Sequence, residues 1–212
     1  MIVLSSYAPF DRSTETEHNQ LAAKRSWEGA FSQIVYFNPL EPRLVSAKTS
    51  FTGHLERPRI REMAEFAAAQ DGWVAIINAD IVVARPMERL DAILNCQRVW
   101  CGISRRLQFE PNGPPKNGRL VDLGLDFFFA RPSVWALVAS EIPDQFVIGK
   151  QLWDTWLLSF FLVHAGEYCV DATAAHMIWH PRHGNRDDFS MEPPPGDTYL
   201  DRVRWPRRKL AT

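Results

Sequence analysis

The apolar run Trp73–Ile77 constrains the fold more than any other stretch of the chain. It contains no polar residue and is rich in β-branched side chains. It is too short for an ordinary helix and does not alternate, so it predicts a strand buried on both faces. Such strands belong to parallel sheets with helices on either side. The run then meets Asn78 and Asp80, at the expected carboxyl end of the strand, where open α/β sheets bind their ligands. A carboxylate there suits a metal ion or a sugar hydroxyl, although an Asp also commonly caps a turn.

The flanking segments alternate between strand and helix patterns, which is the rhythm of βαβ units. Strands are expected at Met1–Leu4, Gln33–Phe37, Arg98–Ser104, Val121–Phe129 and Tyr168–Thr173, the last as a core strand. Helices are expected at Thr14–Phe31, from about Ile60 to Ala67, at Met87–Leu94 and at Trp153–Val163. The stretch Leu44–Gly53 gives no clear prediction, and the Pro- and Gly-rich stretch Glu110–Gly118 predicts a loop.

The composition predicts one soluble α/β domain over residues 1–186, followed by a Pro-rich and then basic tail over 187–212. A formal net charge of −1 argues against a nucleic-acid-binding surface over the whole molecule. No apolar run approaches the ~20 residues of a membrane span, and no signal peptide is visible. Three cysteines without CxxC spacing favour reduced structural thiols and a cytoplasmic setting. The basic tail is expected to be solvated, and contact with anionic lipid at a membrane surface is the weaker alternative.

Several polar side chains are candidates for chemistry, each with a structural alternative. His180 and His183 are three residues apart on an expected loop, where they are either metal ligands for Mn²⁺ or Zn²⁺ or unliganded surface histidines. Asp154, between two tryptophans, either complements the dipole of its helix or is a desolvated general base. Asp126, beside three phenylalanines, has the same ambiguity. Asp80, Asp126 and Asp154 each lie beside apolar residues at an element end, which favours one shared cleft.

Two further groups are candidates for ligand contacts. Ser6 and Tyr7 follow the first strand, where small polar residues let a ligand approach the backbone but also fit any loop. Arg59 and Arg61 lie at the start of a helix, where positive charge opposes the macrodipole. Either an anionic ligand such as a diphosphate or salt bridges to neighbouring glutamates would account for them.

Four segments, in order, resemble the conserved pattern of small GT-A-type glycosyltransferase-like proteins. They are Ile76–Ile81 ("YiNADIi" in the group), Gly124–Arg131 ("GxDxFxFpR"), Ile148–Leu157 ("IGrpxWDNWL") and Val170–Thr173 ("VIDAT") followed by His180–Asn185 ("HQNHDY"). The first helix, with Asn19-Gln20 and Ser26-Trp27, is similar to the group's "RQxxAixSW". Together the segments extend over most of residues 1–186.

The resemblance implies a single Rossmann-like α/β/α sandwich of GT-A type with a mostly parallel sheet. It implies transfer of a sugar from a nucleotide diphosphate sugar to a carbohydrate or other hydroxyl acceptor, with Mn²⁺ or Mg²⁺. Asp80 would then be a metal ligand, Asn78 would face the donor ribose or the metal, and His180 or His183 would complete the metal site.

Further roles follow from the same resemblance. Asp154 would deprotonate the acceptor hydroxyl if the enzyme inverts, and Asp126 would bind sugar hydroxyls. Arg59 and Arg61 would contact the diphosphate. From their place after the first strand, Ser6 and Tyr7 are the residues expected to bind the donor beside them.

Two departures from the group's pattern keep other functions open. Asn78 stands where an Asp is usual, and Pro181-Arg182 and Gly184-Asn185 replace the residues around the histidines. One alternative is a catalytically inactive nucleotide- or sugar-binding module of the same fold. The other is a metal-dependent hydrolase built on Asp80, Asp171, His180 and His183.

Overall fold

The computed structural model describes residues 1–10, 13–83, 88–96, 98–109, 119–150, 152–173 and 178–181. Its strands are β1 (Ile2–Ser5), β2 (Gln33–Tyr36), β3 (Thr49–Phe51), β4 (Val74–Ile77), β5 (Val82–Val83), β6 (Cys101–Phe109), β7 (Arg119–Ala130), β8 (Cys169–Asp171) and β9 (Ile178–Pro181). Its α-helices are α1 (Thr14–Ala30), α2 (Ile60–Ala68), α3 (Glu88–Leu94), α4 (Pro132–Glu141) and α5 (Trp153–His164). Two 3₁₀ turns are η1 (Pro42–Leu44) and η3 (Gly166–Tyr168). No helix among these residues is long and apolar enough to cross a membrane.

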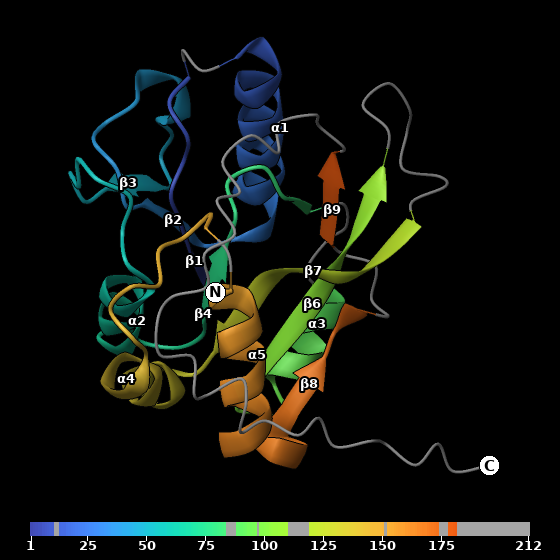
Figure 1. Cartoon of the computed structure of the whole chain (residues 1–212). Coiled ribbons are helices and arrows are strands. Elements are labelled where there is room, and N and C mark those ends of the chain that lie inside the picture. Colours follow the sequence, from blue (N-terminus) through green and yellow to red (C-terminus); the bar gives the residue numbers. More distant parts are fainter. Residues whose placement is uncertain are drawn as a thin grey trace.

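One sheet connects the described strands in the order β3-β2-β1-β4-β7-β6-β9-β5, with β8 paired to β6 beside this path (Figure 1). Five of its pairings are parallel, and those of β4 with β7, β6 with β7 and β5 with β9 are antiparallel. The expected α/β fold with a mostly parallel sheet is therefore confirmed.

The central strand β4 is buried on both faces, as its unbroken apolar sequence predicts. Val74 and Ile76 pack into the core beneath α2, α4 and α5. Ala75 and Ile77 pack on the opposite face, beneath α1 and α3. Three layers result, with helices on both sides of the sheet.

The order in which strands are added to the sheet reverses at β1. From β1 it passes through α1 to β2 and on to β3, and then returns through α2 to β4 on the other side of β1. The crossover helices α1 and α2 pack on opposite faces. The gap between the carboxyl ends of β1 and β4 is therefore the topological switch point, where α/β sheets of this kind bind ligands.

Strand β4 pairs in parallel with β1 but antiparallel with β7, where Ile77 lies opposite Phe127. The reason is that β7 forms an antiparallel pair with β6, which precedes it in the chain. The core strand expected over Tyr168–Thr173 needs correction. The strand that forms, β8, is shorter and does not lie in the core, because Cys169 and Val170 are half-buried and Asp171 is exposed.

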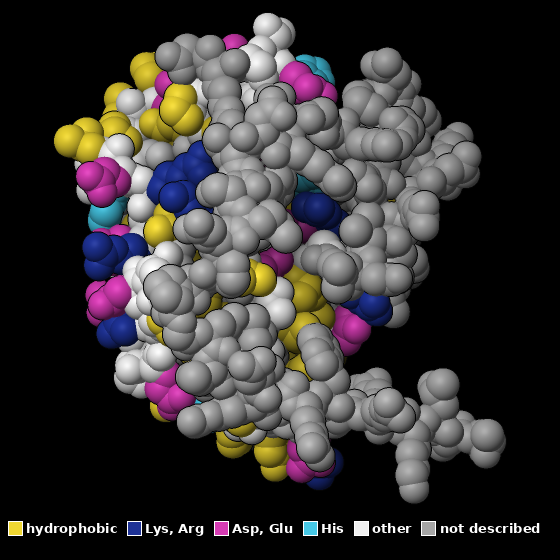
Figure 2. Space-filling model, in the orientation of Figure 1, with side chains coloured by type: hydrophobic (Ala, Val, Ile, Leu, Met, Phe, Trp, Pro, Cys, Tyr) yellow, Lys and Arg dark blue, Asp and Glu magenta, His cyan; other side chains and the backbone are white. Residues whose placement is uncertain are grey.

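Neither sign of charge dominates the described part of the face in Figure 2. Lys and Arg side chains alternate with Asp and Glu side chains over the described part of the face in Figure 2, in keeping with the formal net charge of −1. The expected boundary at residue 186 and the tail over 187–212 lie outside the described residues.

Candidate functional site

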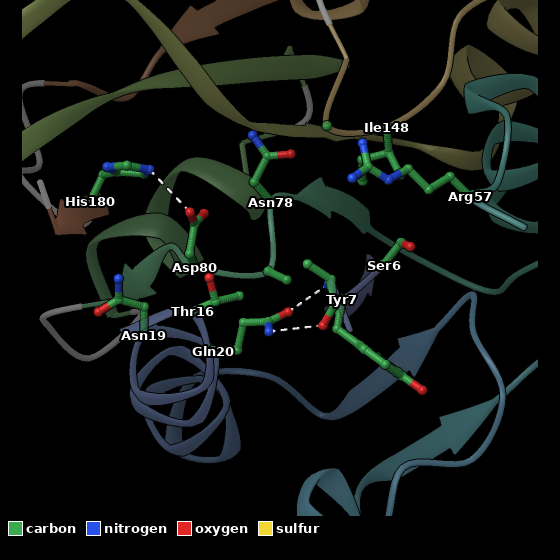
Figure 3. A pocket seen from close by; sticks show the side chains of 13 residues that line it. Ser6, Tyr7, Thr16, Asn19, Gln20, Arg57, Asn78, Asp80, Ile148 and His180 are labelled. Atoms are coloured by element: carbon green, nitrogen blue, oxygen red, sulfur yellow. Dashed lines mark hydrogen bonds and ion pairs between the residues drawn. The ribbon is translucent and has the colours of Figure 1, made fainter. Parts of the chain in front are cut away.

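A pocket of about 230 Å³ lies at the switch point (Figure 3). Its walls come from the loops after β1 and β4, the first turns of α1, the segments before α2 and α5, and strand β9. The lining residues are Ser6, Tyr7, Ala8, Thr16, Asn19, Gln20, Arg57, Asn78, Ala79, Asp80, Ile148, Gly149 and His180. Neutral amide and hydroxyl groups predominate, with Asp80 and His180 in one part and Arg57 in another. Such a lining suits a polar ligand.

Two side-chain amides hold the loop after β1 in place. Asn38, at the end of β2, accepts from the backbone N–H of Tyr7 (2.8 Å) and donates to its carbonyl (3.2 Å). Gln20 of α1 does the same for Ala8, at 2.7 and 3.0 Å. Both amides are at least nine-tenths buried. Because four backbone groups are satisfied in this way, this wall of the pocket is formed before any ligand binds.

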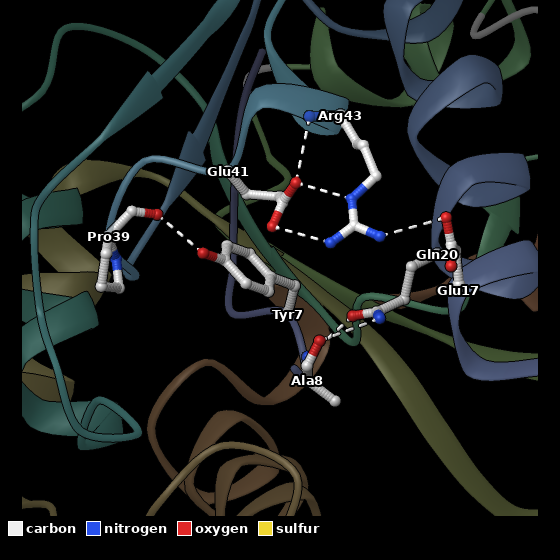
Figure 4. A network of polar contacts seen from close by, with 7 residues as sticks. All are labelled: Tyr7, Ala8, Glu17, Gln20, Pro39, Glu41 and Arg43. Atoms are coloured by element: carbon white, nitrogen blue, oxygen red, sulfur yellow. Dashed lines mark hydrogen bonds and ion pairs between the residues drawn. The ribbon is translucent and has the colours of Figure 1, made fainter. Parts of the chain in front are cut away.

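The side chain of Tyr7 is held by a hydrogen bond at the end of its ring (Figure 4). Its hydroxyl donates to the carbonyl of Pro39 at 2.7 Å. Burial raises the pKa of Tyr7, and the nearby charge of Glu41 adds to this while Arg43 opposes it. The phenol therefore stays neutral and remains a donor at physiological pH. Arg43 itself pairs with Glu41 at 2.7 Å and Glu17 at 3.2 Å.

Asp80 and His180 meet at the opposite wall. Asp80 follows β4, and the next strand, β5, pairs with β9, so Val82 lies opposite Trp179, the neighbour of His180. The Nε2 atom of His180 lies 3.2 Å from an Asp80 carboxylate oxygen. The His180 side chain is 9% exposed and that of Asp80 is 26% exposed. His180 was expected on a loop, but it lies on strand β9; His183 lies outside the described residues.

Asn78 connects the pocket to a second carboxylate. Its amide nitrogen donates to Asp126 at 2.6 Å, and Arg106 contacts the other oxygen of Asp126 at 3.0 Å. The arginine reaches Asp126 across Gly124, where an added Cβ would lie 2.6 Å from the Arg106 Nε atom. Asp126 is only 4% exposed. It lies on β7 one residue before Phe127, the partner of Ile77, and so comes beside the residue that follows β4.

Asp154 lies close enough to Asp126 for their charges to interact. It is in the first turn of α5, half-buried, and accepts from the backbone N–H of Thr155 at 2.8 Å. Burial raises the pKa of Asp154 to about 6, and the charge of Asp126 contributes to the rise while the hydrogen bond to Thr155 opposes it. A carboxyl group with such a pKa can accept a proton near neutral pH.

Of the arginines at the start of α2, Arg57 lines the pocket, whereas Arg59 and Arg61, which were expected there, do not. Arg57 lies beside Gly149. Arg59 precedes the helix, where its backbone N–H donates to Glu62 at 2.8 Å. Arg61 pairs with Asp144 at 2.6 Å, and its side chain also donates to the carbonyl of Ile142.

The pocket therefore brings together five of the ten residues named from the sequence. These are Ser6, Tyr7, Asn78, Asp80 and His180. Asp126 adjoins it through Asn78, and Asp154 lies near Asp126 without lining the pocket. Arg59 and Arg61 do not line it, and His183 lies outside the described residues.

Several residues of the site were not predicted from the sequence. Some of them have a local sequence feature that could have indicated them, and others have none. Asn19 and Gln20 were part of the motif resemblance of the first helix but were not predicted to line a site, although both are polar and buried. Arg57 lies two residues before Arg59 and could have been named with it as a candidate for contacting an anionic ligand. Asn38 and Arg106 carry no local signal, because their partners are distant in sequence.

The site offers two ligands for a metal ion. Among the residues that the structure describes, no group of three or more His, Cys, Asp or Glu side chains is placed to hold one. Asp80 and His180, with donor atoms 3.2 Å apart, supply one carboxylate and one imidazole. This mixed set fits Mn²⁺ or Zn²⁺ better than Mg²⁺, with the remaining ligands left to substrate oxygens.

No protein-family model matches the sequence, and no curated protein matches it. Among solved structures, similar chains include a protein assigned as a glucose-1-phosphate thymidylyltransferase from Bacillus anthracis in complex with sucrose (6% identity, TM-score 0.49, covering 86% of this chain and 87% of that one). Others are a 4-diphosphocytidyl-2C-methyl-D-erythritol synthase from Anaerococcus prevotii (9%, 0.47, 80% and 86%) and HddC from Yersinia pseudotuberculosis (10%, 0.42, 72% and 84%). At these identities and TM-scores the likeness carries no functional assignment.

Proposed function

We propose that the chain is a glycosyltransferase that moves a sugar from a nucleotide diphosphate sugar to a hydroxyl acceptor. The observation that carries the proposal is the pairing of Asp80 with His180 in the wall of a polar pocket at the switch point. The sequence resemblance to GT-A-type proteins at Asn78–Asp80 and around Asp154 supports it from an independent direction.

The charges of the pocket are complementary to a nucleotide diphosphate with a bound cation. Asp80 and His180 would hold a divalent ion, and Arg57 adds a positive charge from another wall. When bound, such an ion balances the negative charge that develops on the leaving diphosphate. The volume of about 230 Å³ lies below the ~300–1,000 Å³ of drug-sized ligand pockets, so the pocket would enclose only part of the donor.

Of the two acidic residues next to the pocket, Asp154 would act on the acceptor and Asp126 would act through Asp154. Asp154, with a pKa of about 6, would take the proton of the attacking hydroxyl. Asp126 would keep its place beside Asp154 through its contacts to Asn78 and Arg106. In this role Asp126 is a positioning residue, whose negative charge helps to raise the proton affinity of Asp154.

Asp171, one of the four residues of the hydrolase alternative, lies too far from His180 to share a site with it. Asp171 is the register partner of Ile103 in β6, whereas His180 is the register partner of Gln108 in the same strand. Five residues of strand separate these positions by roughly 16 Å, at ~3.3 Å per residue. Asp171 instead lies 3.6 Å from Arg105. An inactive nucleotide-binding module remains the main rival, and the experiment below separates it from a transferase.

The test is thermal unfolding with a panel of nucleoside diphosphates, nucleoside triphosphates and nucleotide sugars, with and without Mn²⁺. A ligand that binds only the native state stabilises it by about 2.7 kcal/mol at a hundredfold excess over its dissociation constant. We expect a rise in the midpoint that needs both Mn²⁺ and one nucleotide sugar. A rise indifferent to Mn²⁺, with no sugar transfer, would favour the binding module, and a preference for a triphosphate would indicate nucleotidyl transfer.

Asp80→Asn and His180→Gln should both abolish the Mn²⁺-dependent rise while leaving the fold intact. Asp71→Asn is the matched control, because Asp71 is exposed before the amino end of β4, away from the pocket. If Asp80→Asn kept the wild-type response, the assignment of Asp80 to the ligand site would be wrong.

A further inference from the structure

Two cysteines lie side by side in the sheet, away from the residues that line the pocket. Cys101 of β6 is the register partner of Cys169 in the parallel strand β8. Both are free thiols, and they share a hydrogen bond in which Cys101 donates. Neighbouring strands are ~4.8 Å apart, within the ~4.4–6.8 Å that separates the Cα atoms of a disulfide.

The two thiols differ in access and in acidity. Cys101 is fully buried, whereas Cys169 is partly exposed. The hydrogen bond from Cys101 lowers the pKa of Cys169, although burial and the charge of Asp171 oppose this. The same hydrogen bond, together with burial, raises the pKa of Cys101. Because the thiolate is the nucleophile, Cys169 is the thiol that reacts first.

Strand β8 is suited to the small movement that a disulfide requires. The Cβ atoms of a disulfide must approach to ~3.5–4.5 Å, closer than side-by-side strands normally hold them. β8 has only three residues and is partly exposed along its length, so it can shift towards β6. A bond formed under such strain is more easily reduced than a relaxed structural disulfide.

We propose that Cys101 and Cys169 form a reversible intramolecular disulfide when the protein meets a small disulfide oxidant such as oxidised glutathione. The Cys169 thiolate attacks one glutathione sulfur, forms a mixed disulfide and releases glutathione thiolate. Cys101 then gives up its proton and attacks the Sγ atom of Cys169, and the second glutathione leaves as the thiol. In total the protein loses two hydrogen atoms, and the oxidant is reduced to two thiols.

The experiment uses the full chain with Cys96→Ser, because Cys96 is exposed and would bind glutathione by itself. After incubation with oxidised glutathione, the intact mass should fall by two hydrogen masses, and peptide mapping should join the peptides of Cys101 and Cys169. Dithiothreitol should restore the original mass. A lasting glutathione adduct on Cys169, or no change in mass, would overturn the proposal.

Two variants in the same background test the order of attack. With Cys101→Ser, Cys169 has no resolving partner and should keep one glutathione. With Cys169→Ser, the buried Cys101 should stay a thiol in the folded protein. If Cys101 took up glutathione as readily as Cys169 does, the assigned roles of the two thiols would be reversed.

Discussion

Substitution of Asp154 by Asn should stabilise the protein at neutral pH while removing the proposed base. In the folded chain the pKa of Asp154 is raised from 3.8 to about 6. Since each pH unit corresponds to 1.36 kcal/mol, the charged form of this one group costs about 3 kcal/mol of folding free energy once the pH is well above 6.

The sign follows from proton binding. The folded state holds the proton more tightly than the unfolded state, so unfolding releases it between pH 3.8 and about 6. The wild type is therefore penalised progressively as the pH rises through this window, by roughly 0.5 kcal/mol at pH 4 and about 3 kcal/mol at pH 8. Asn carries no charge and escapes the penalty. Its amide oxygen can still accept from the backbone N–H of Thr155, which Asp154 now does at 2.8 Å.

The assay is denaturant unfolding of the wild type and Asp154→Asn at several values between pH 4 and pH 8. The difference in unfolding free energy should grow in favour of the variant by about 2 kcal/mol over this range. Asp71→Asn, at an exposed position, is the control variant for this comparison. A difference for Asp154→Asn that stayed constant within about 0.5 kcal/mol would refute the reasoning. In a transferase the same variant should lose about 10²-fold or more of its activity.

Other substitutions test the packing of the sheet and the loop after β1. Gly102→Ala should destabilise the fold by about 1–3 kcal/mol in denaturant unfolding, because the new Cβ would lie 2.6 Å from Val170. Gly29→Ala, in α1 with no atom within 4 Å of the added Cβ, should instead stabilise by up to about 1 kcal/mol. Asn38→Ala should cost about 1–3 kcal/mol, since it leaves two backbone groups of Tyr7 unpaired. It should also weaken nucleotide binding in the thermal assay, because the wall of the pocket is no longer held.

The sequence predicts the centre of the fold well because the signal there is local. The run Trp73–Ile77 is apolar at every position, and β4 accordingly contributes to the cores on both sides of the sheet. The polar residues that end such a strand must then emerge at its carboxyl edge. The convergence of Asp80 with Ser6 follows from this rule and from the parallel pairing of β1 with β4.

The remaining features depend on pairings between distant segments, which a single sequence does not encode locally. The antiparallel β7 follows from its pairing with β6. His180 reaches Asp80 because β9 joins β5, about 95 residues away in the chain. Arg57, Arg59 and Arg61 lie close together in the sequence, but only Arg57 lines the pocket. Only the path of the backbone decides which of the three faces the pocket.

The position of Asn78 gives the departure from the GT-A pattern a physical explanation. Its amide donates to Asp126, a role that a carboxylate could not fill without placing two negative charges 2.6 Å apart. That hydrogen bond and Arg106 together hold Asp126 where its charge raises the pKa of Asp154. An Asp at position 78 would gain a metal ligand but would repel Asp126. On this reasoning the asparagine leaves the proposed metal-binding role to Asp80 and His180, and its hydrogen bond to Asp126 links the pocket to the proposed base.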